Sequence, residues 1–141
     1  VVGVEIDPRQ AALAAHALAP ACEVVLAEPA GAADTARSLA AGELCIDFVP
    51  DTICDGLRGT LGQPDFEVLR ALGAEVVVVD DAAVVAAMRL LWQVLKQTVE
   101  PSSATVLAAV LAQPQRFAGK RVGLLLSGGN VDIDALPWSG A

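Results

Sequence analysis

Aromatic and basic residues are scarce in this chain. Of its 141 residues none is tyrosine, one is histidine and nine are lysine or arginine, against 17 aspartates and glutamates. The formal net charge is therefore −8 at pH 7, and the pI is about 4.4. Because so acidic a surface repels phosphate backbones, we expect no nucleic-acid partner.

Cysteines and long apolar runs are also few. Cys22, Cys45 and Cys54 are odd in number and show no C-x-x-C spacing, which predicts reduced thiols in a cytoplasmic protein and neither disulfides nor a zinc site. No apolar run reaches the roughly 18 residues that cross a bilayer, so we expect no membrane span. The chain begins Val1-Val2-Gly3, without a methionine or a basic-then-apolar leader, so we expect a fragment without a secretion signal.

Alanine, valine and leucine are abundant, and 55% of the residues are hydrophobic. Apolar runs alternate with helical patterns, which predicts a single α/β domain over residues 1–141, with a mainly parallel sheet flanked by helices. The expected strands are Val1–Val4, Glu23–Ala27, Glu75–Val79 and Arg121–Leu126. The expected helices are Asp34–Ala41, Pro64–Leu72, one capped by Asp80 and Asp81, and one that begins at Glu100-Pro101.

The last expected strand ends abruptly in Ser127-Gly128-Gly129-Asn130. In open α/β sheets, ligands bind beyond the carboxyl ends of the strands, and paired glycines let backbone approach a ligand closely. The pattern therefore predicts either a ligand loop, with the Ser127 hydroxyl in the site, or a plain turn in which the glycines supply positive φ.

A second candidate is the long segment Leu44–Thr60, which contains Pro50, Gly56 and Gly59 and shows no clear period. Long ordered loops in compact domains tend to be functional. On the residues alone, its Asp55-Gly56 pair is typical of a simple turn.

Four stretches, in order along the chain, resemble one family of enzymes. They are Glu28–Asp34 with Ser38–Gly42, Thr52–Leu57, Val99–Ser102 and Leu126–Asp132. They resemble the pyridoxal-phosphate-dependent threonine/serine dehydratases and serine racemase, of the tryptophan synthase β-like superfamily (fold type II). The resemblance covers most of the chain from about Glu23 onward. It implies the C-terminal portion of a larger dehydratase-like fold, within its large domain.

The resemblance implies a pyridoxal phosphate site that converts serine or threonine to a 2-oxo acid and ammonia. The cofactor acts as an electron sink, and the partner of its ring nitrogen tunes it. Ser127 matches the family's ring-nitrogen residue, and its neutral hydroxyl makes the ring a milder sink than a carboxylate would. The other residues implied to line the cofactor are Gly128, Gly129, Asp55, Gly56 and Glu100.

The resemblance also implies a divalent-cation site at Glu28, the Ala32 carbonyl and Asp34. Mg²⁺ and Ca²⁺ prefer carboxylate and carbonyl oxygens, with water completing the shell. The alternative is that Asp34 caps the following helix and pairs with Arg37, while Glu28 is solvated.

The relatives suggest two further features. Where a nucleotide effector binds at the subunit interface of relatives, the matching positions are Lys96 and Asn130. Relatives are mostly dimers that act on amino acids, so the resemblance implies a homo-oligomer with an amino-acid substrate.

The resemblance implies that several parts of the family's active site are missing here, among them the asparagine that contacts the ring and the second catalytic base. The glycine-rich phosphate loop should fall near Gly3–Asp7, where only Gly3 matches and two carboxylates would oppose a phosphate. The Schiff-base lysine lies upstream in the family, and neither Lys96 nor Lys120 has its Ser-x-Lys context. We therefore expect no catalytic residue in this chain and no activity from the chain alone. The alternative is a non-catalytic remnant or binding module with the same fold.

Overall fold

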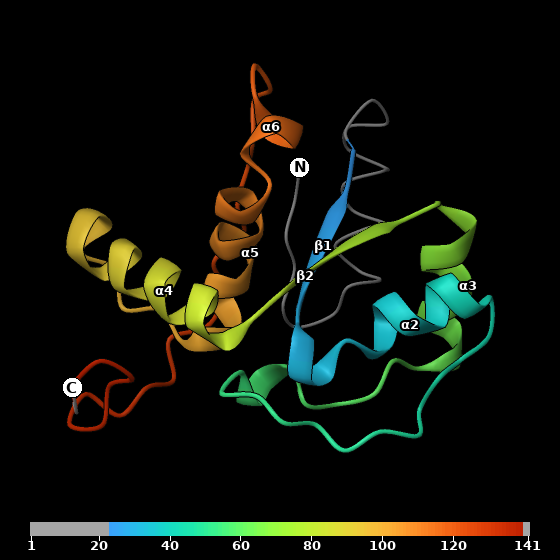
Figure 1. Ribbon diagram of the computed structural model, residues 1–141, viewed down its shortest axis with the longest axis horizontal. Coiled ribbons are helices and arrows are strands. Elements are labelled where there is room, and N and C mark those ends of the chain that lie inside the picture. The colour runs from blue at the N-terminus through green and yellow to red at the C-terminus, as the bar shows by residue number, and fades with distance from the viewer. Residues whose placement is uncertain (1–22, 140–141) are drawn as a thin grey trace.

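The computed structural model describes residues 23–139, in which two parallel strands lie between two groups of helices (Figure 1). The predicted strand Val1–Val4 and the expected phosphate-loop positions lie outside these residues. The elements are β1 (Val25–Pro29), η1 (Ala30–Ala32), α2 (Asp34–Ala41), η2 (Asp55–Leu57), α3 (Gln63–Ala71), β2 (Glu75–Val79), α4 (Asp81–Leu95), α5 (Pro101–Ala112) and α6 (Pro114–Phe117). In this part of the chain, no helix combines the length and apolar character that a membrane span requires.

The two strands pair in parallel, with Val25 opposite Glu75. The β2 strand has the predicted bounds, whereas β1 begins at Val25 and not at the predicted Glu23. The Glu23 carboxylate instead forms surface ion pairs with Arg116 (3.0 Å) and Lys120 (2.8 Å). A charged residue held in that way marks the solvated edge of the sheet, where the strand has not yet entered the core.

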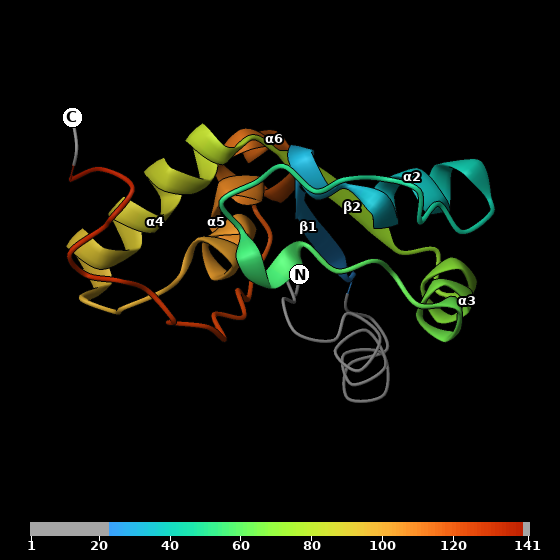
Figure 2. The same cartoon turned by 90° about the horizontal axis from the view of Figure 1, so that it is seen from below.

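Alternate side chains of the strands enter two separate cores. Figure 2 shows α4 and α5 on one side of the strands and α2 and α3 on the other. One core joins strand residues to α4 and α5, and its buried members include Val25, Ala27, Val77, Val79, Val84, Met88 and Ala104. The other joins Leu26 to Leu61, Phe66 and Leu69. β1 is buried on both faces, which explains its apolar run, whereas β2 buries Val77 and Val79 and leaves Val78 exposed. The parallel pair flanked by helices confirms the predicted α/β class.

The predicted strand Arg121–Leu126 is wrong, because this segment belongs to neither strand of the described sheet. Its side chains do alternate: Val122, Leu124 and Leu126 pack against the core, and the residues between them are exposed. Such alternation is typical of an extended chain with one face on a core. A strand also needs a hydrogen-bonded neighbour, which an apolar sequence cannot reveal by itself.

The start of α4 provides a test of local stability. The Asp80 side chain accepts a hydrogen bond from the Ala83 N–H at 2.6 Å, which makes it the N-cap of the helix. We expect Asp80→Ala to lower the free energy of unfolding by about 1 kcal/mol, measured by urea unfolding followed by circular dichroism. Asp80→Asn keeps an acceptor and should restore most of that loss. Equal losses in both variants would contradict the cap.

Candidate functional site

The first turn of α5 carries two buried serines that bind two distant loops. Ser102 and Ser103 are 0% and 1% exposed. The Ser103 hydroxyl oxygen accepts hydrogen bonds from the N–H groups of Ser127 (3.0 Å) and Gly128 (3.3 Å). The Ser102 hydroxyl oxygen accepts one from the Gly56 N–H at 3.1 Å. The two loops that the sequence marks as candidates therefore meet at one helix N-terminus.

Glu100 precedes this turn and closes the Ser127–Asn130 loop at a second point. Its backbone N–H donates to the Gly128 carbonyl at 3.1 Å, and its carboxylate accepts from the Asn130 N–H at 2.7 Å. Glu100 is buried, so its carboxylate needs donors to offset the loss of water. The loop supplies such a donor, and the carboxylate in turn holds the loop.

The paired glycines of this loop are required by close contacts. Neither Gly128 nor Gly129 has positive φ, so the alternative of a plain turn with positive φ is wrong. A Cβ on Gly128 would overlap the Glu100 carboxylate, and one on Gly129 would lie 2.8 Å from the Thr98 carbonyl oxygen. The loop is glycine-rich because it packs against the segment that leads into α5.

The segment before η2 is held at the start of α4. The Thr52 hydroxyl donates to Asp81 Oδ1 at 2.6 Å, and the Ile53 N–H donates to Asp81 Oδ2 at 2.9 Å. The guanidinium of Arg58 donates to the Thr52 carbonyl through Nε (3.1 Å) and a terminal nitrogen (2.6 Å). These bonds fix the loop at the carboxyl end of β2.

The Asp55-Gly56 pair forms a local turn and also contacts α5. The Asp55 side chain is exposed and accepts from the Gly56 N–H at 3.0 Å, as in a local turn. The same N–H also reaches the Ser102 hydroxyl. The Asp55-Gly56 turn therefore also binds the first turn of α5.

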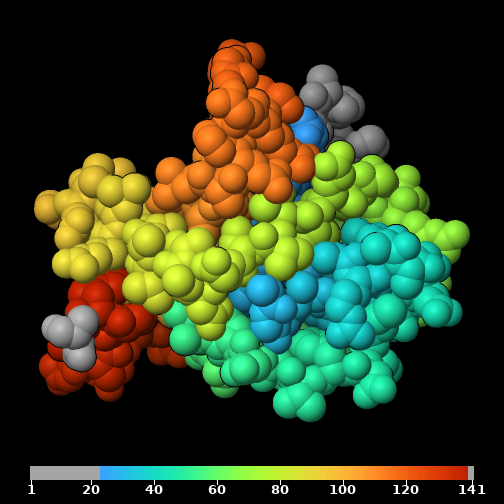
Figure 3. Space-filling model, viewed as in Figure 1, coloured from blue at the N-terminus to red at the C-terminus, as the bar shows by residue number. Residues whose placement is uncertain are grey.

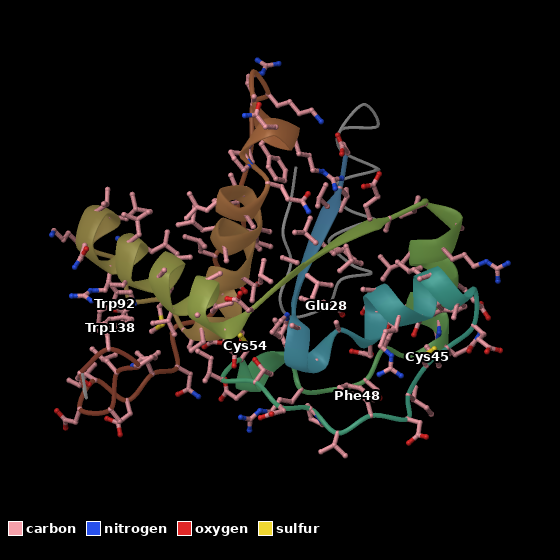
Figure 4. The ribbon with its side chains drawn as sticks, viewed as in Figure 1. Glu28, Cys45, Phe48, Cys54, Trp92 and Trp138 are labelled. Atoms are coloured by element: carbon pink, nitrogen blue, oxygen red, sulfur yellow. The ribbon has the colours of Figure 1, made fainter. Side chains whose placement is uncertain are left out.

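Glu28, the first of the three predicted cation ligands, lies at the N-terminus of α2 (Figure 4). Its carboxylate accepts hydrogen bonds from the N–H groups of Thr35 (3.2 Å) and Ala36 (3.0 Å). Burial raises the pKa of Glu28; the hydrogen bonds from Thr35 and Ala36 oppose this effect, and the charge of Asp34 adds to it. Glu28 is thus a desolvated helix-capping carboxylate and not a solvated one.

Asp34 is buried beside Glu28, with a different partner from the one expected in the helix-cap alternative. Its carboxylate accepts from the Leu61 N–H at 2.6 Å, and the N-cap of α2 is Ala33, with Asp34 the first residue inside the helix. The guanidinium of Arg37 lies 5.9 Å from the centre of the Phe48 ring. The alternative in which Asp34 caps α2 is therefore wrong. Within residues 23–139, no group of three or more His, Cys, Asp or Glu side chains is placed to hold a metal ion.

The predicted effector positions are the end of α4, at Lys96, and the loop held by Glu100, at Asn130. Lys96 ends α4 with a φ of 57°, a left-handed conformation that is uncommon outside glycine, and its Nζ donates to the Gln93 carbonyl at 2.6 Å. Asn130 is held through its backbone N–H by Glu100. Both residues are exposed.

Sequence reasoning gave no role to Ser102, although it lies in the Val99–Ser102 stretch, and it missed Ser103; these two residues bring the loops together. The available signal was a pair of hydroxyl residues in the first turn of an otherwise apolar helix, where side-chain acceptors commonly bind backbone N–H groups. What that pattern lacks is any indication of which distant loops it binds.

Residues 11–128 match the family described as "Pyridoxal-phosphate dependent enzyme". The chain belongs to this family. The resemblance seen in its motifs is thereby confirmed, and the fold matches part of the fold type II pyridoxal-phosphate enzymes.

Several members of the family are similar to this chain. The beta-hydroxyaspartate dehydratase of Paracoccus denitrificans (strain Pd 1222) is 44% identical over 122 residues, which cover 86% of this chain and 39% of that protein. Serine racemase of Arabidopsis thaliana is 42% identical over 130 residues, covering 89% and 39%. The chain therefore spans about 39% of the length of these two relatives.

Solved structures of the family give the same picture. Maize serine racemase superposes with a TM-score of 0.85 and 40% identity, covering 94% of this chain and 43% of that one. The T.th. threonine deaminase superposes with a TM-score of 0.84 and 38% identity, covering 93% and 49%. The fold of the pyridoxal-phosphate enzyme is thus shared over almost the whole of this chain.

Glu28 makes the stability of this family member depend on pH. Because its pKa is raised from 4.5 in the folded chain, the folded state keeps a proton that the unfolded state has lost. Its contribution to the free energy of unfolding is therefore largest at low pH and falls as pH rises from about 4.5 through the folded pKa. We expect the difference in that free energy, parent minus Glu28→Gln, to decrease over this range.

Urea unfolding at a series of pH values measures this difference. Glu43→Gln, at an exposed position, controls for the change from carboxylate to amide. A difference for Glu28→Gln that stays level or grows with pH would contradict the desolvated carboxylate.

Proposed function

We propose that the chain is the C-terminal portion of a pyridoxal-phosphate-dependent threonine/serine dehydratase, which releases a 2-oxo acid and ammonia from L-threonine or L-serine. The chain contributes one side of the cofactor site. Residues upstream in the parent protein contribute the lysine that holds the cofactor and the glycine-rich phosphate loop. The observation that carries the proposal is the closure of the Ser127–Asn130 loop on Glu100 and Ser103.

The Ser127 position suits the ring nitrogen of the cofactor. Its N–H is bound to the Ser103 hydroxyl, which fixes the residue, while Ser127 itself is exposed at the end of the core-packed segment. A neutral hydroxyl can pair with a pyridine nitrogen that carries no proton. When bound, pyridoxal phosphate supplies the electron sink, and Gly128, Gly129, Asp55, Gly56 and Glu100 line or hold its surroundings.

The chain's two lysines support the expectation that it is inactive alone. Lys120 forms an ion pair with Glu23 at 2.8 Å, next to the amino end of β1, at the opposite edge of the sheet from η1 and α2. Lys96 donates to the Gln93 carbonyl at the end of α4. Neither lies beside the two loops held by α5, which fits a parent protein whose cofactor-binding lysine lies upstream. The second candidate function is a non-catalytic binding module of the same fold.

Joining this chain to the N-terminal portion of the Paracoccus relative separates the two candidates. We expect the chimera to retain pyridoxal phosphate through dialysis and to release ammonia from L-threonine or L-serine, with β-hydroxyaspartate as a third substrate to compare. Ser127→Ala removes one hydrogen bond to the cofactor and should lower kcat/KM about tenfold. Ser139→Ala, in the C-terminal segment, is the matched control.

The assay separates the two candidate functions and tests the role of Ser127. Cofactor retention without ammonia release would favour the binding module. Full activity in Ser127→Ala would contradict the assigned role of Ser127.

We extend the proposal to a divalent cation at Glu28, the Ala32 carbonyl and Asp34. The Glu28 oxygens already accept from α2 and one Asp34 oxygen from Leu61, so water would have to fill most of the shell and binding would be weak. At ten times the dissociation constant, Mg²⁺ or Ca²⁺ should stabilise the chain by about 1–2 kcal/mol. Thermal melts of the parent and Asp34→Asn test this. An equal rise in both would mean only screening of the −8 net charge.

A homo-oligomer and a nucleotide effector near Lys96 and Asn130 complete the proposal. The exposed apolar side chains Leu90, Val94 and Leu95 at the end of α4 support association, because apolar surface on a helix favours contact with another chain.

A further inference from the structure

Trp92, in the second half of α4, bonds to the segment that leads into α5. Its indole N–H donates to the Val99 carbonyl at 2.9 Å. The ring of Trp138, from the C-terminal segment, meets Trp92 edge-on at 5.6 Å between centroids and 82° between planes (Figure 4). Figure 3 shows this C-terminal segment packed against α4. Trp92 therefore lies between the connection to α5 and the tail.

The bond from Trp92 acts on the same peptide group that holds the Ser127–Asn130 loop. The Val99 carbonyl and the Glu100 N–H belong to one planar peptide unit, in which the two groups point in opposite directions. The carbonyl accepts from Trp92, and the N–H donates to the Gly128 carbonyl at 3.1 Å. An indole that fixes one end of this plane also fixes the direction in which the other end donates.

Burial makes this bond matter. Val99 and Glu100 are 4% and 7% exposed, so without the indole the Val99 carbonyl would have little access to water. A buried carbonyl without a donor favours rotation of its peptide plane toward another partner. Such a rotation would move the Glu100 N–H away from Gly128 and shift the carboxylate that holds Asn130.

We propose that Trp92 is a positioning residue: its indole N–H orients the Val99–Glu100 peptide and thereby sets the position of the Ser127–Asn130 loop. The consequence for cofactor binding rests on the proposed function, whereas the orientation of the loop does not. Trp138 contacts the Trp92 ring edge-on, whereas the hydrogen bond to Val99 comes from Trp92.

Amide hydrogen exchange in the full chain, followed by NMR, tests the positioning without any cofactor. Trp92→Phe keeps an aromatic ring but removes the donor, and Trp138→Phe is the matched control that keeps it. In Trp92→Phe we expect exchange at the Glu100 and Asn130 amides to rise about tenfold, with the β2 amides unchanged. In Trp138→Phe we expect less than about a twofold change at the same amides.

Three outcomes would overturn the positioning role: no change in Trp92→Phe, an equal rise throughout the chain, or an equal rise in both variants. If Trp92→Phe fails to fold, the hydrogen-exchange rates of the two indole N–H groups in the parent chain test the positioning role. The chain has two tryptophans, so Trp138→Phe assigns both signals. A Trp92 indole N–H that exchanges as fast as that of Trp138 would overturn the role.

A second measurement links the positioning to the cofactor. In the chimera described above, Trp92→Phe should raise the dissociation constant for pyridoxal phosphate about tenfold, and Trp138→Phe should leave it within about twofold. An unchanged constant in Trp92→Phe would overturn the link. A parent chimera that binds no cofactor would refute the proposed function alone, because the exchange experiment would still report on the loop.

Discussion

The buried first turn of α5 is the constraint on which the candidate site depends. A helix N-terminus leaves backbone donors unsatisfied and usually attracts acceptors from nearby in the sequence. Here the roles are reversed, because the side chains of Glu100, Ser102 and Ser103 accept from backbone N–H groups of two other segments. Because these side chains are buried, each hydrogen bond that they accept replaces one lost to water. Few other positions of the two loops would satisfy all of their backbone donors.

The same constraint accounts for the sequence of the loop. Glu100 enters the space where a side chain of residue 128 would lie, and the Thr98 carbonyl does the same at residue 129. Glycine at both positions lets the backbone approach so closely that its N–H groups reach Ser103 and Glu100. Ser127, directly before the two glycines, is held by the same Ser103 hydroxyl through its backbone N–H.

Sequence patterns predicted the local elements well and the tertiary contacts poorly. Glu75–Val79 and Asp34–Ala41 were found with the correct bounds, because a β-branched run and a helical segment closed by glycine are local signals. Arg121–Leu126 looked like a strand because its composition is that of one, but pairing depends on a neighbour. Glu28 was predicted as a metal ligand or a solvated carboxylate, and its bonds to α2 depend on the direction in which η1 turns the chain.

The carboxyl ends of the two parallel strands explain why these separate features share one edge of the molecule. Glu28, near the end of β1, binds the start of α2, and β2 leads into Asp80 and Asp81 at the start of α4. Asp81 binds the loop before η2, and that loop reaches Ser102 on α5.

Helix N-termini that follow parallel strands all point to this edge, where open α/β sheets bind their ligands. At the opposite edge, Arg116 forms ion pairs with Glu23 (3.0 Å) and Glu75 (2.7 Å), and such pairs at a protein surface contribute little stability. The two edges therefore differ, because buried side-chain acceptors hold the loops at one edge and surface ion pairs form at the other.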